Sequence, residues 1–243
     1  MEDLKEELAS VSLEGDPRLK RSPLSPLILG MGGRSRWVGL ARKIAYKLEG
    51  GYFYSYSLRK ILQKRRGVTI GAYSYGGCFV ERFIDPGTVI GHFVSVAEGV
   101  RIMGRNHPLN APSLHPFFFN AQLGWVAKDL LPYRPIFIGH DAWIGANALI
   151  MPSVERVGIG SVIGAGSIVT KDVPDFAVVV GSPAKIVKYR FSEEERDLLL
   201  ASRWWELSIQ KAIPFLQDFG ESRGRGAEFF PKVSSRAFPE GAE

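Results

Sequence analysis

The chain contains almost no cysteine, and it lacks both long apolar runs and the pattern of a secretory leader. Its one cysteine, Cys78, cannot form a disulfide within the chain. No stretch of about 18 apolar residues occurs, so we expect no membrane-spanning helix. The first residues, MEDLKEELAS, are acidic and lack the basic-then-apolar order of a signal peptide. Together these absences favour a reducing compartment, and we expect a cytoplasmic protein.

The charge balance of the chain is basic. Its 243 residues include 31 Lys and Arg against 25 Asp and Glu, which gives a formal net charge of +6. This balance favours acidic partners, such as a phosphorylated cofactor, an anionic polymer or a membrane surface. With 45% hydrophobic and 23% charged residues, the composition is typical of a globular protein with one principal domain.

A six-residue repeat is the strongest pattern in the sequence. Within residues 138–186, branched aliphatic residues recur every six positions, with one step of seven. They are Ile138, Ile144, Ile150, Val157, Ile163 and Val169. This period predicts an all-β solenoid of short parallel strands, in which three faces of six residues form each coil and one aliphatic per face points inward. An ordinary β sandwich with chance spacing is the alternative. The seven-residue step after Ile150 predicts a one-residue bulge.

The same rhythm occurs earlier in the chain and is then interrupted. It is clear at Ile84, Ile90, Val96 and Ile102, and it resumes at Ile138. The intervening residues 103–136 have no six-residue phase, so we expect a long excursion loop. Long loops in compact domains are usually functional, and insertions in solenoids often form the binding surface.

The remaining segments flank this solenoid. Ser192 and Glu195 form a capping box, which predicts that a helix begins there. The composition after this helix is rich in Gly, Ser, Arg and Pro, as in disordered segments. We therefore divide the chain into a flexible leader (1–33), a basic helical extension (34–67), the solenoid domain (68–190), a C-terminal α-helix (191–218) and a disordered tail (219–243).

The basic extension carries ten Lys or Arg against one Glu over residues 34–66. Trp37, Leu40, Ile44 and Leu48 recur at helical spacing. We interpret this segment as a helix that lies against the end of the solenoid through these apolar side chains, with a solvated basic face. The alternative is that the segment contacts an anionic or lipid-linked substrate at a membrane surface.

Only four histidines are available for acid–base chemistry. His92 and His140 follow an inward aliphatic by two positions, where we expect the side chain to lie on the surface. His107 lies early in the excursion beside Asn106, where it could face a cleft and act as a general base. His115 is better suited to anchoring the loop.

Several segments resemble the hexapeptide-repeat acyltransferases. They are NHP at 106–108, HPFFFN at 115–120, IGHDAWIGANALIMPSV at 138–154 and VIGAGSIVTKDVPDFAVVVGSPAKIVKYRF at 162–191. The chain is most similar to the xenobiotic (chloramphenicol and streptogramin) acetyltransferase subfamily and its polysaccharide relatives, over about residues 68–210. This resemblance implies a left-handed parallel β-helix that forms a homotrimer. It also implies acetyl-CoA in the groove between neighbouring prisms, with the excursion loop closing over the acceptor.

The resemblance also implies roles for individual residues. His107 takes the place of the family's catalytic histidine, and Asn106 or a backbone N–H would stabilise the oxyanion. The positions that match cofactor contacts are Trp143, Ala146, Ala165, Gly166, Thr170, Lys171, Lys185 and Lys188. Among these, the small residues would let the pantetheine arm approach, and the lysines would lie near the nucleotide phosphates.

Aromatic residues are candidates for the acceptor pocket. Tyr52, Tyr54 and Tyr56 form a cluster that either packs in the extension or forms one wall of the pocket, and Phe118 and Trp125 lie in the excursion. We expect an acetyl-CoA-dependent O-acetyltransferase acting on a sugar or polysaccharide precursor, with no resident metal and no nucleic-acid partner. An antibiotic O-acetyltransferase is the alternative.

Two further classes compete with an acyltransferase. The γ-carbonic-anhydrase-like enzymes share the solenoid and bind zinc through three histidines, a role for which His92, His107 and His140 would be needed. However, their spacing does not resemble that family, and the GSPAK segment favours CoA. A non-catalytic scaffold is the other class, and the presence of His107 in its NHP segment argues against it.

Overall fold

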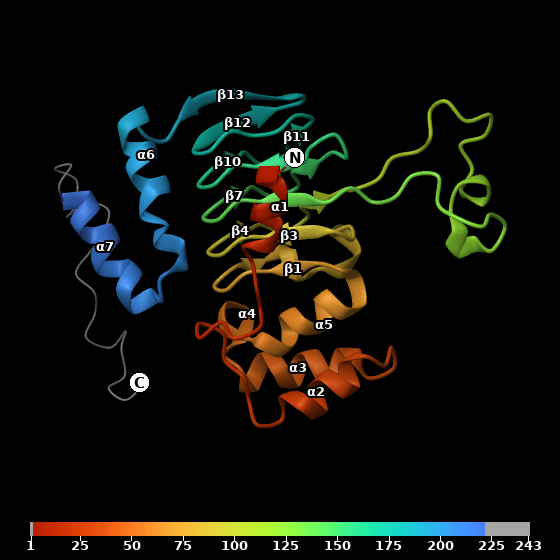
Figure 1. Cartoon of the computed structure of the whole chain (residues 1–243), viewed down its shortest axis with the longest axis horizontal. Coiled ribbons are helices and arrows are strands. Elements are labelled where there is room, and N and C mark those ends of the chain that lie inside the picture. The colour runs from red at the N-terminus through yellow and green to blue at the C-terminus, as the bar shows by residue number, and fades with distance from the viewer. Residues whose placement is uncertain (1, 222–243) are drawn as a thin grey trace. The chain divides into compact units, whose positions relative to one another are not determined.

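The computed structural model describes residues 2–221, and its main feature is a three-sided stack of short strands (Figure 1). The first sheet contains, in order, β1 (Thr69–Ile70), β3 (Thr88–Ile90), β6 (Ile136–Ile138) and β9 (Arg156–Val157). The second contains β2 (Tyr75–Gly76), β4 (Ser95–Val96), β7 (Trp143–Ile144), β10 (Val162–Ile163), β12 (Ala177–Gly181) and β13 (Ala184–Tyr189). The third contains β5 (Arg101–Ile102), β8 (Leu149–Ile150) and β11 (Ile168–Val169).

The chain visits the three sheets in turn, as a coil of three faces requires. From β3 it passes to β4 and β5, from β6 to β7 and β8, and from β9 to β10 and β11. Neighbouring strands are parallel, apart from the closing pair β12 and β13. The aliphatics of the six-residue repeat are buried in one continuous core, which confirms that they point inward. Burial of this apolar column is the main stabilising contribution to the prism.

Glycine is required where each strand bends into the next face. A Cβ on Gly139 would lie 2.5 Å from the backbone nitrogen of Ile159, and one on Gly145 would lie 2.5 Å from that of Ala165. Both distances are far below van der Waals contact, so a larger residue would push the stacked coils apart. The glycine after the aliphatic therefore sets the close spacing of the coils.

The seven-residue step lies in a turn rather than in a strand. Ile138 still pairs with Val157, so the register of β6 and β9 is unaffected. The Asp172 carboxylate accepts hydrogen bonds from the backbone N–H groups of Glu155 (2.8 Å) and Arg156 (3.1 Å). The predicted strand bulge is therefore wrong, because a capped turn absorbs the extra residue.

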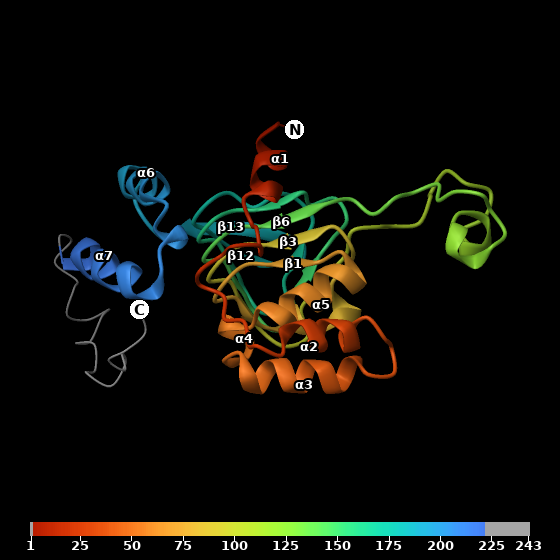
Figure 2. The same cartoon turned by 60° about the horizontal axis from the view of Figure 1, so that its bottom comes forward.

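The excursion lies between β5 and β6, where the repeat stops. Its two ends are joined by a hydrogen bond from Arg134 N–H to Gly104 O (2.8 Å). Two short 3₁₀ helices, η3 (Pro116–Phe118) and η4 (Ala121–Leu123), form its outer part. Asp129 accepts from Ala121 N–H (2.7 Å) and pairs with Arg105 (3.2 Å). Figures 1 and 2 show the excursion extending away from the side of the prism.

Helices cover the end of the prism at which the first coil begins. The helices are α2 (Ser25–Gly32), α3 (Val38–Leu48), α4 (Gly51–Tyr54) and α5 (Tyr56–Arg66), with α1 (Glu2–Ala9) alongside β6. In this layer α5 contacts β1, and α2 and α3 pack on α5 from outside (Figure 2).

The leader predicted to be flexible instead packs along the prism. Glu7 of α1 pairs with Arg156 at 2.8 Å. Arg18 pairs with Asp16, and its Nη2 lies 3.0 Å from Nε2 of His92. These contacts involve residues far along the chain, so composition alone does not indicate them.

The apolar face predicted for α3 is only partly buried: Ile44 packs against the core, but the other three side chains are exposed. Trp37, Leu40 and Leu48 are 38%, 46% and 51% exposed, whereas Ala41 and Ala45 are fully buried. Helix α3 therefore packs on its neighbours through its smallest side chains, which allow the closest approach. Leu40 and Leu48 remain exposed, whereas Val38 and Ile44 are partly buried against the core.

Two buried charged side chains hold the helical layer together. The Glu49 carboxylate accepts hydrogen bonds from the hydroxyls of Ser25 (2.6 Å), Ser55 (2.6 Å) and Ser57 (2.8 Å). The Arg59 guanidinium donates to backbone carbonyls, including that of Gly71 at 3.1 Å in the first coil. Each charge is thus compensated by hydrogen bonds rather than by an opposite charge, as buried ions require.

The C-terminal segment contains two helices instead of the single helix predicted over 191–218. They are α6 (Glu193–Ser202) and α7 (Ile209–Glu221), separated by η5 (Trp204–Glu206). Helix α6 ends just before Arg203, whose φ of 47° lies in the left-handed region. The capping box is present, with Glu195 N–H donating to Ser192 Oγ and Ser192 N–H to the Glu195 carboxylate. Among the described residues, 197–221 form a second compact unit.

Two expectations concern the ends of the chain and its relation to a bilayer. The tail predicted to be disordered, 219–243, lies outside the described residues from 222 onward. Across residues 2–221, none of the helices is both long and apolar enough to cross a bilayer.

Candidate active site

His107 is held in one tautomer by the excursion. Its Nδ1 lies 2.7 Å from the carbonyl oxygen of Leu114. Because a carbonyl oxygen can only accept, Nδ1 carries the proton and donates it, which leaves the lone pair of the neutral ring on Nε2. The ring also meets that of Phe119 edge-on, with centroids 5.3 Å apart. An exposed imidazole with a free Nε2 lone pair can accept a proton from an incoming hydroxyl.

Asn106 shapes the turn that carries this histidine. Its side-chain oxygen accepts a hydrogen bond from His107 N–H at 3.1 Å. The oxygen is therefore occupied, and the amide NH₂ is the part of the side chain suited to donate to a developing oxyanion.

The aromatic residues of the excursion divide into buried and exposed groups. Phe119 is buried, whereas Phe118 and Trp125 are exposed. His115 Nδ1 accepts from Phe117 N–H at 3.3 Å and so caps η3, which is the anchoring role expected for it. Phe118 and Trp125 are thus available to a second molecule, and Phe119 supports His107 from inside the loop.

Ala146, Ala165 and Gly166 lie together at one corner of the prism, between the second and third sheets. Gly166 N–H donates to Ala146 O at 2.8 Å, which places the two turns directly on top of one another. Gly166 has a φ of 69°, and no atom of the described residues lies within 4 Å of the position that its Cβ would take. This corner is a strip of backbone without large side chains, and it fits the approach of an extended pantetheine arm.

The basic residues suggested for the phosphates lie on two different elements. Lys185 and Lys188 are exposed on β13, opposite Val180 and Val178 of β12. Trp143, on β7 of the same sheet, is also exposed. These positions fit an anionic and partly aromatic ligand along the second sheet.

Thr170 and Lys171 lie at a different corner. They follow β11 where the chain turns from the third sheet toward the first, which is also the corner from which the excursion leaves. His107 and Lys171 therefore share one side of the third sheet, and Ala146 and Ala165 lie on the other side. One chain does not bring all of the predicted site residues together.

The predicted tyrosine wall is not part of this arrangement. The Tyr56 hydroxyl donates to Glu14 at 2.8 Å, and burial together with this carboxylate raises the pKa of Tyr56. Tyr52 stacks on Phe79, and Tyr54 meets Tyr73 edge-on. These tyrosines lie in α4 and at the start of α5, on the opposite side of the prism from the excursion (Figures 1 and 2). They stabilise the helical layer.

His92 and His140 are buried, at 3% and 5% exposure, so the expectation of surface histidines is wrong. His92 Nδ1 accepts from Ala72 N–H, and His140 Nδ1 accepts from His92 N–H, both at 2.9 Å. Each side chain thus turns back along the prism to satisfy an amide of the preceding coil. Burial, and secondarily the charges of Arg18 and Arg59, lowers the pKa of His92 to about 3.

This arrangement also bears on the zinc alternative. The Nδ1 atoms of His92 and His140 accept backbone hydrogen bonds, and His107 lies in the excursion. Across residues 2–221, no three His, Cys, Asp or Glu side chains are clustered as metal ligands. The rings of His92 and His140 stack with centroids 5.0 Å apart, but His107 belongs to the excursion and does not join them in a cluster.

Two positions in the excursion were not identified from the sequence. They are the Leu114 carbonyl, which selects the tautomer of His107, and Phe119, which packs against its ring. The Phe117–Phe119 run is visible in the sequence, but its pattern does not tell which of the three rings turns inward. A backbone carbonyl has no sequence signal.

Comparison with known proteins identifies close relatives. The chain is 36% identical over 191 residues to a chloramphenicol acetyltransferase of Klebsiella aerogenes, covering 68% of this chain and 90% of that protein. It is 35% identical over 195 residues to one of Escherichia coli, covering 70% and 92%.

Structural comparison finds, among others, a maltose O-acetyltransferase from Clostridium difficile 630. It is 24% identical, with a TM-score of 0.39, covering 70% of this chain and 90% of that chain. No family model matches the chain. The extent of the two chloramphenicol acetyltransferase matches nevertheless shows that this chain is an acyltransferase and belongs to the hexapeptide-repeat acyltransferase family.

Proposed function

We propose that the protein is an acetyl-CoA-dependent O-acetyltransferase whose acceptor is a hydroxyl of a sugar or polysaccharide precursor. The observation that carries the proposal is the 2.7 Å contact between His107 Nδ1 and Leu114 O, which leaves Nε2 as the proton acceptor. Membership of an acyltransferase family supplies the class of reaction.

The reaction follows from this tautomer. His107 Nε2 takes the proton of the acceptor hydroxyl as its oxygen attacks the thioester carbonyl of acetyl-CoA. The Leu114 carbonyl stabilises the resulting imidazolium by accepting the Nδ1–H hydrogen bond, and the Asn106 amide donates to the oxyanion. When the C–S bond breaks, the imidazolium returns the proton to the thiolate. The products are an acetyl ester and CoA.

The donor would lie along the open corner of the prism. Ala146, Ala165 and Gly166 would line the pantetheine arm, where the absence of bulk allows backbone groups to approach it. The family's phosphate positions correspond to Lys171, Lys185 and Lys188, which are all exposed. Trp143 offers an exposed aromatic surface on the same sheet as Lys185 and Lys188, and Thr170 precedes Lys171 in the chain.

The division of these residues between two corners supports a homotrimer of left-handed prisms. Each groove would then combine the excursion corner of one chain, with His107, and the open corner of its neighbour, with Ala146 and Ala165. The exposed Phe118 and Trp125 would close over the acceptor in the same groove.

The sugar acceptor is favoured by the helical layer before the first coil, and an antibiotic hydroxyl is the second candidate. The matches to chloramphenicol acetyltransferases cover about two-thirds of this chain, so about a third of it lies outside them. The antibiotic acceptor is favoured by the relatives themselves, which are named chloramphenicol acetyltransferases.

A screen of acceptors tests the proposal directly. Release of free CoA from acetyl-CoA is measured with sugars, sugar nucleotides, oligosaccharides, chloramphenicol and streptogramin alcohols, and the acetylated product is identified by mass spectrometry. We expect ester formation on a saccharide, with loss of turnover in His107→Ala. Turnover with an antibiotic and with no saccharide would show that the acceptor is the antibiotic rather than a sugar. A product acetylated on nitrogen would overturn the proposed O-acetylation.

A further inference from the structure

The outer surface of the helical layer exposes large apolar side chains. Trp37, Leu40 and Leu48 project from α3 and the turn before it, and Leu24 and Leu27, at and within the start of α2, are also exposed. Helices α2 and α3 pack against each other at the end of the prism (Figure 2). We call this surface the α2–α3 face. A soluble protein rarely exposes several large apolar side chains together unless they contact a partner.

Positive charge surrounds these apolar side chains. Over residues 34–66 the one acidic residue, Glu49, is buried beneath the surface. Arg42 and Lys60 are paired with Glu81 and Glu14. Five exposed basic residues have no acidic partner within residues 2–221: Arg34, Arg36, Lys43, Lys47 and Lys64. The face therefore combines apolar anchors with uncompensated cations.

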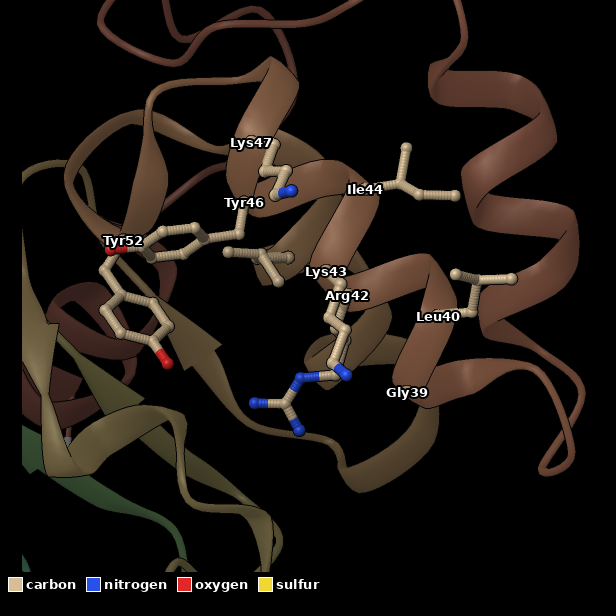
Figure 3. A pocket seen from close by; sticks show the side chains of 9 residues that line it. Gly39, Leu40, Arg42, Lys43, Ile44, Tyr46, Lys47 and Tyr52 are labelled. Carbon is tan, nitrogen blue, oxygen red and sulfur yellow. The ribbon is translucent and has the colours of Figure 1, made fainter.

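A groove of about 650 Å³ lies against α3 and is also lined by Tyr52 and Leu58. Leu40 and Ile44 lie on one side of the helix, and Tyr46 and Tyr52 lie on the other (Figure 3). Lys43 and Lys47 provide the uncompensated positive charge of its lining, since Arg42 is paired with Glu81. The groove therefore offers apolar walls and cations to the same occupant.

The face is rigid rather than a loose basic tail. The Glu49 hydrogen bonds and the close packing of Ala41 and Ala45 hold α2, α3 and α5 together. An occupant would therefore meet a preformed surface, which reduces the entropic cost of binding.

We propose that the α2–α3 face docks on a membrane surface that contains anionic phospholipids. The apolar side chains would enter the interfacial region, and the cations would pair with lipid phosphates. A second copy of the chain fits less well, because a symmetric contact would bring like charges together. The excursion leaves from the side of the prism, so docking through the helical layer leaves the excursion clear of the bilayer (Figure 1).

Vesicle flotation of the full-length protein tests this proposal. The protein is mixed with phosphatidylcholine vesicles that either contain or lack phosphatidylglycerol, at low and high salt. We expect flotation with the phosphatidylglycerol vesicles at low salt and much less with phosphatidylcholine alone. Loss of two interfacial lysines in Lys43→Gln/Lys47→Gln should weaken binding about tenfold or more. Leu40→Ser/Leu48→Ser should weaken binding to the same vesicles through lost apolar contact.

The matched control is Lys5→Gln/Lys211→Gln, which changes the net charge equally through exposed lysines elsewhere. It should float like the wild type, and circular dichroism should show that all variants are folded. Failure of the wild type to float at low salt would overturn the proposal, as would equal loss in the control. Self-association without vesicles that is lost in both face variants would identify a second copy as the occupant. Acetyl transfer to a soluble acceptor should be unchanged in every variant, so this test is independent of the proposed reaction.

Discussion

At the scale of single residues, hydrogen-bond partners set the protonation of each imidazole. His107 meets a carbonyl and must donate from Nδ1, whereas His92 and His140 meet backbone N–H groups and must accept through the same atom. Both ring nitrogens of His92 face hydrogen-bond donors, namely the Ala72 N–H and the Arg18 guanidinium. Protonation of this ring to the imidazolium is therefore disfavoured. The same residue type thus serves as a candidate base in the loop and as a structural acceptor in the prism.

Substitution of His107 should remove the reaction without removing the fold. We expect His107→Ala to lower kcat by about 10²–10⁴, the usual contribution of a general base. Because the side chain is exposed, the thermal transition and the Kd for CoA, measured by calorimetry, should not change. His115→Ala provides the control, since it alters a histidine of the same loop that has only an anchoring contact. Comparable losses in both variants would argue for a loop effect instead of base catalysis.

The buried carboxylate of Glu49 should make stability depend on acid. Burial raises the pKa of Glu49, but hydrogen bonds from Ser25, Ser55 and Ser57 outweigh it and hold the pKa below the ordinary 4.5. Its stabilising effect is therefore complete above pH 4.5 and is lost as the pH falls through the folded-state value. At neutral pH we expect Glu49→Gln to lower the free energy of unfolding by about 3 kcal/mol, since buried donors lose a charged acceptor.

Urea denaturation at several pH values measures this difference. The gap between wild type and Glu49→Gln should narrow below pH 4.5, whereas Glu98→Gln, at an exposed site, should differ little at any pH. A gap that stays constant as the carboxyl is protonated would contradict the linkage.

At the scale of elements, the excursion is a small packed unit. Its ends meet at Gly104 and Arg134, and Asp129 holds its outer turn. Phe119 forms its interior beside His107. A loop with this internal support can hold a base in place, which a disordered loop of the same length cannot do.

Loss of the Phe119 ring should therefore act through His107. We expect Phe119→Ala to lower kcat about tenfold, because the base loses its orientation. The Kd for CoA should be unchanged, and Phe119→Leu should restore most of the activity by refilling the space. Phe118→Ala should instead raise KM for the acceptor, as its exposed ring is suited to contact it. If Phe119→Ala altered only KM, the positioning role would be wrong.

Helix α3 shows how packing can reverse a sequence pattern. Its apolar residues at helical spacing predict a buried face, yet the partner helices pack on Ala41 and Ala45. An amphipathic pattern shows that two faces differ, but it does not identify which face the neighbours contact. Helices α2 and α5 both contact α3, and Ala41 and Ala45 are the fully buried residues of α3, with Ile44 partly buried beside them.

At the scale of the whole molecule, the candidate site is split between two corners of the prism. His107 and Ala165 lie on opposite sides of the third sheet within one chain. In the proposed trimer, a groove would combine one corner from each of two neighbouring copies, so the oligomer is part of the proposed chemistry.

Mixed trimers test this division. Light scattering should give a mass three times the 26.9 kDa of one chain. His107→Ala and Ala165→Trp, which blocks the open corner, should each be inactive alone. When the two are co-expressed in equal amounts, random assembly should restore about a quarter of the sites, because some grooves receive both intact corners. Mixed trimers without activity would show that both corners of a site come from the same chain.

The sequence by itself determined the parts of this protein that depend on local order. The six-residue period predicted the inward aliphatics from Ile84 to Val169, and the capping box located the start of α6. The excursion was also visible, as the place where the period stops. These features can be predicted from the sequence because each depends on residues that are close in the chain.

Only the tertiary structure decided the features that depend on distant neighbours. It determined that the leader packs on the prism, that His92 and His140 are buried, and that Leu40 and Leu48 of α3 remain exposed. It also determined the tautomer of His107, through a backbone carbonyl seven residues away. The physical reason is that hydrogen bonding and close packing depend on which groups meet in space, and a local pattern does not identify the partner.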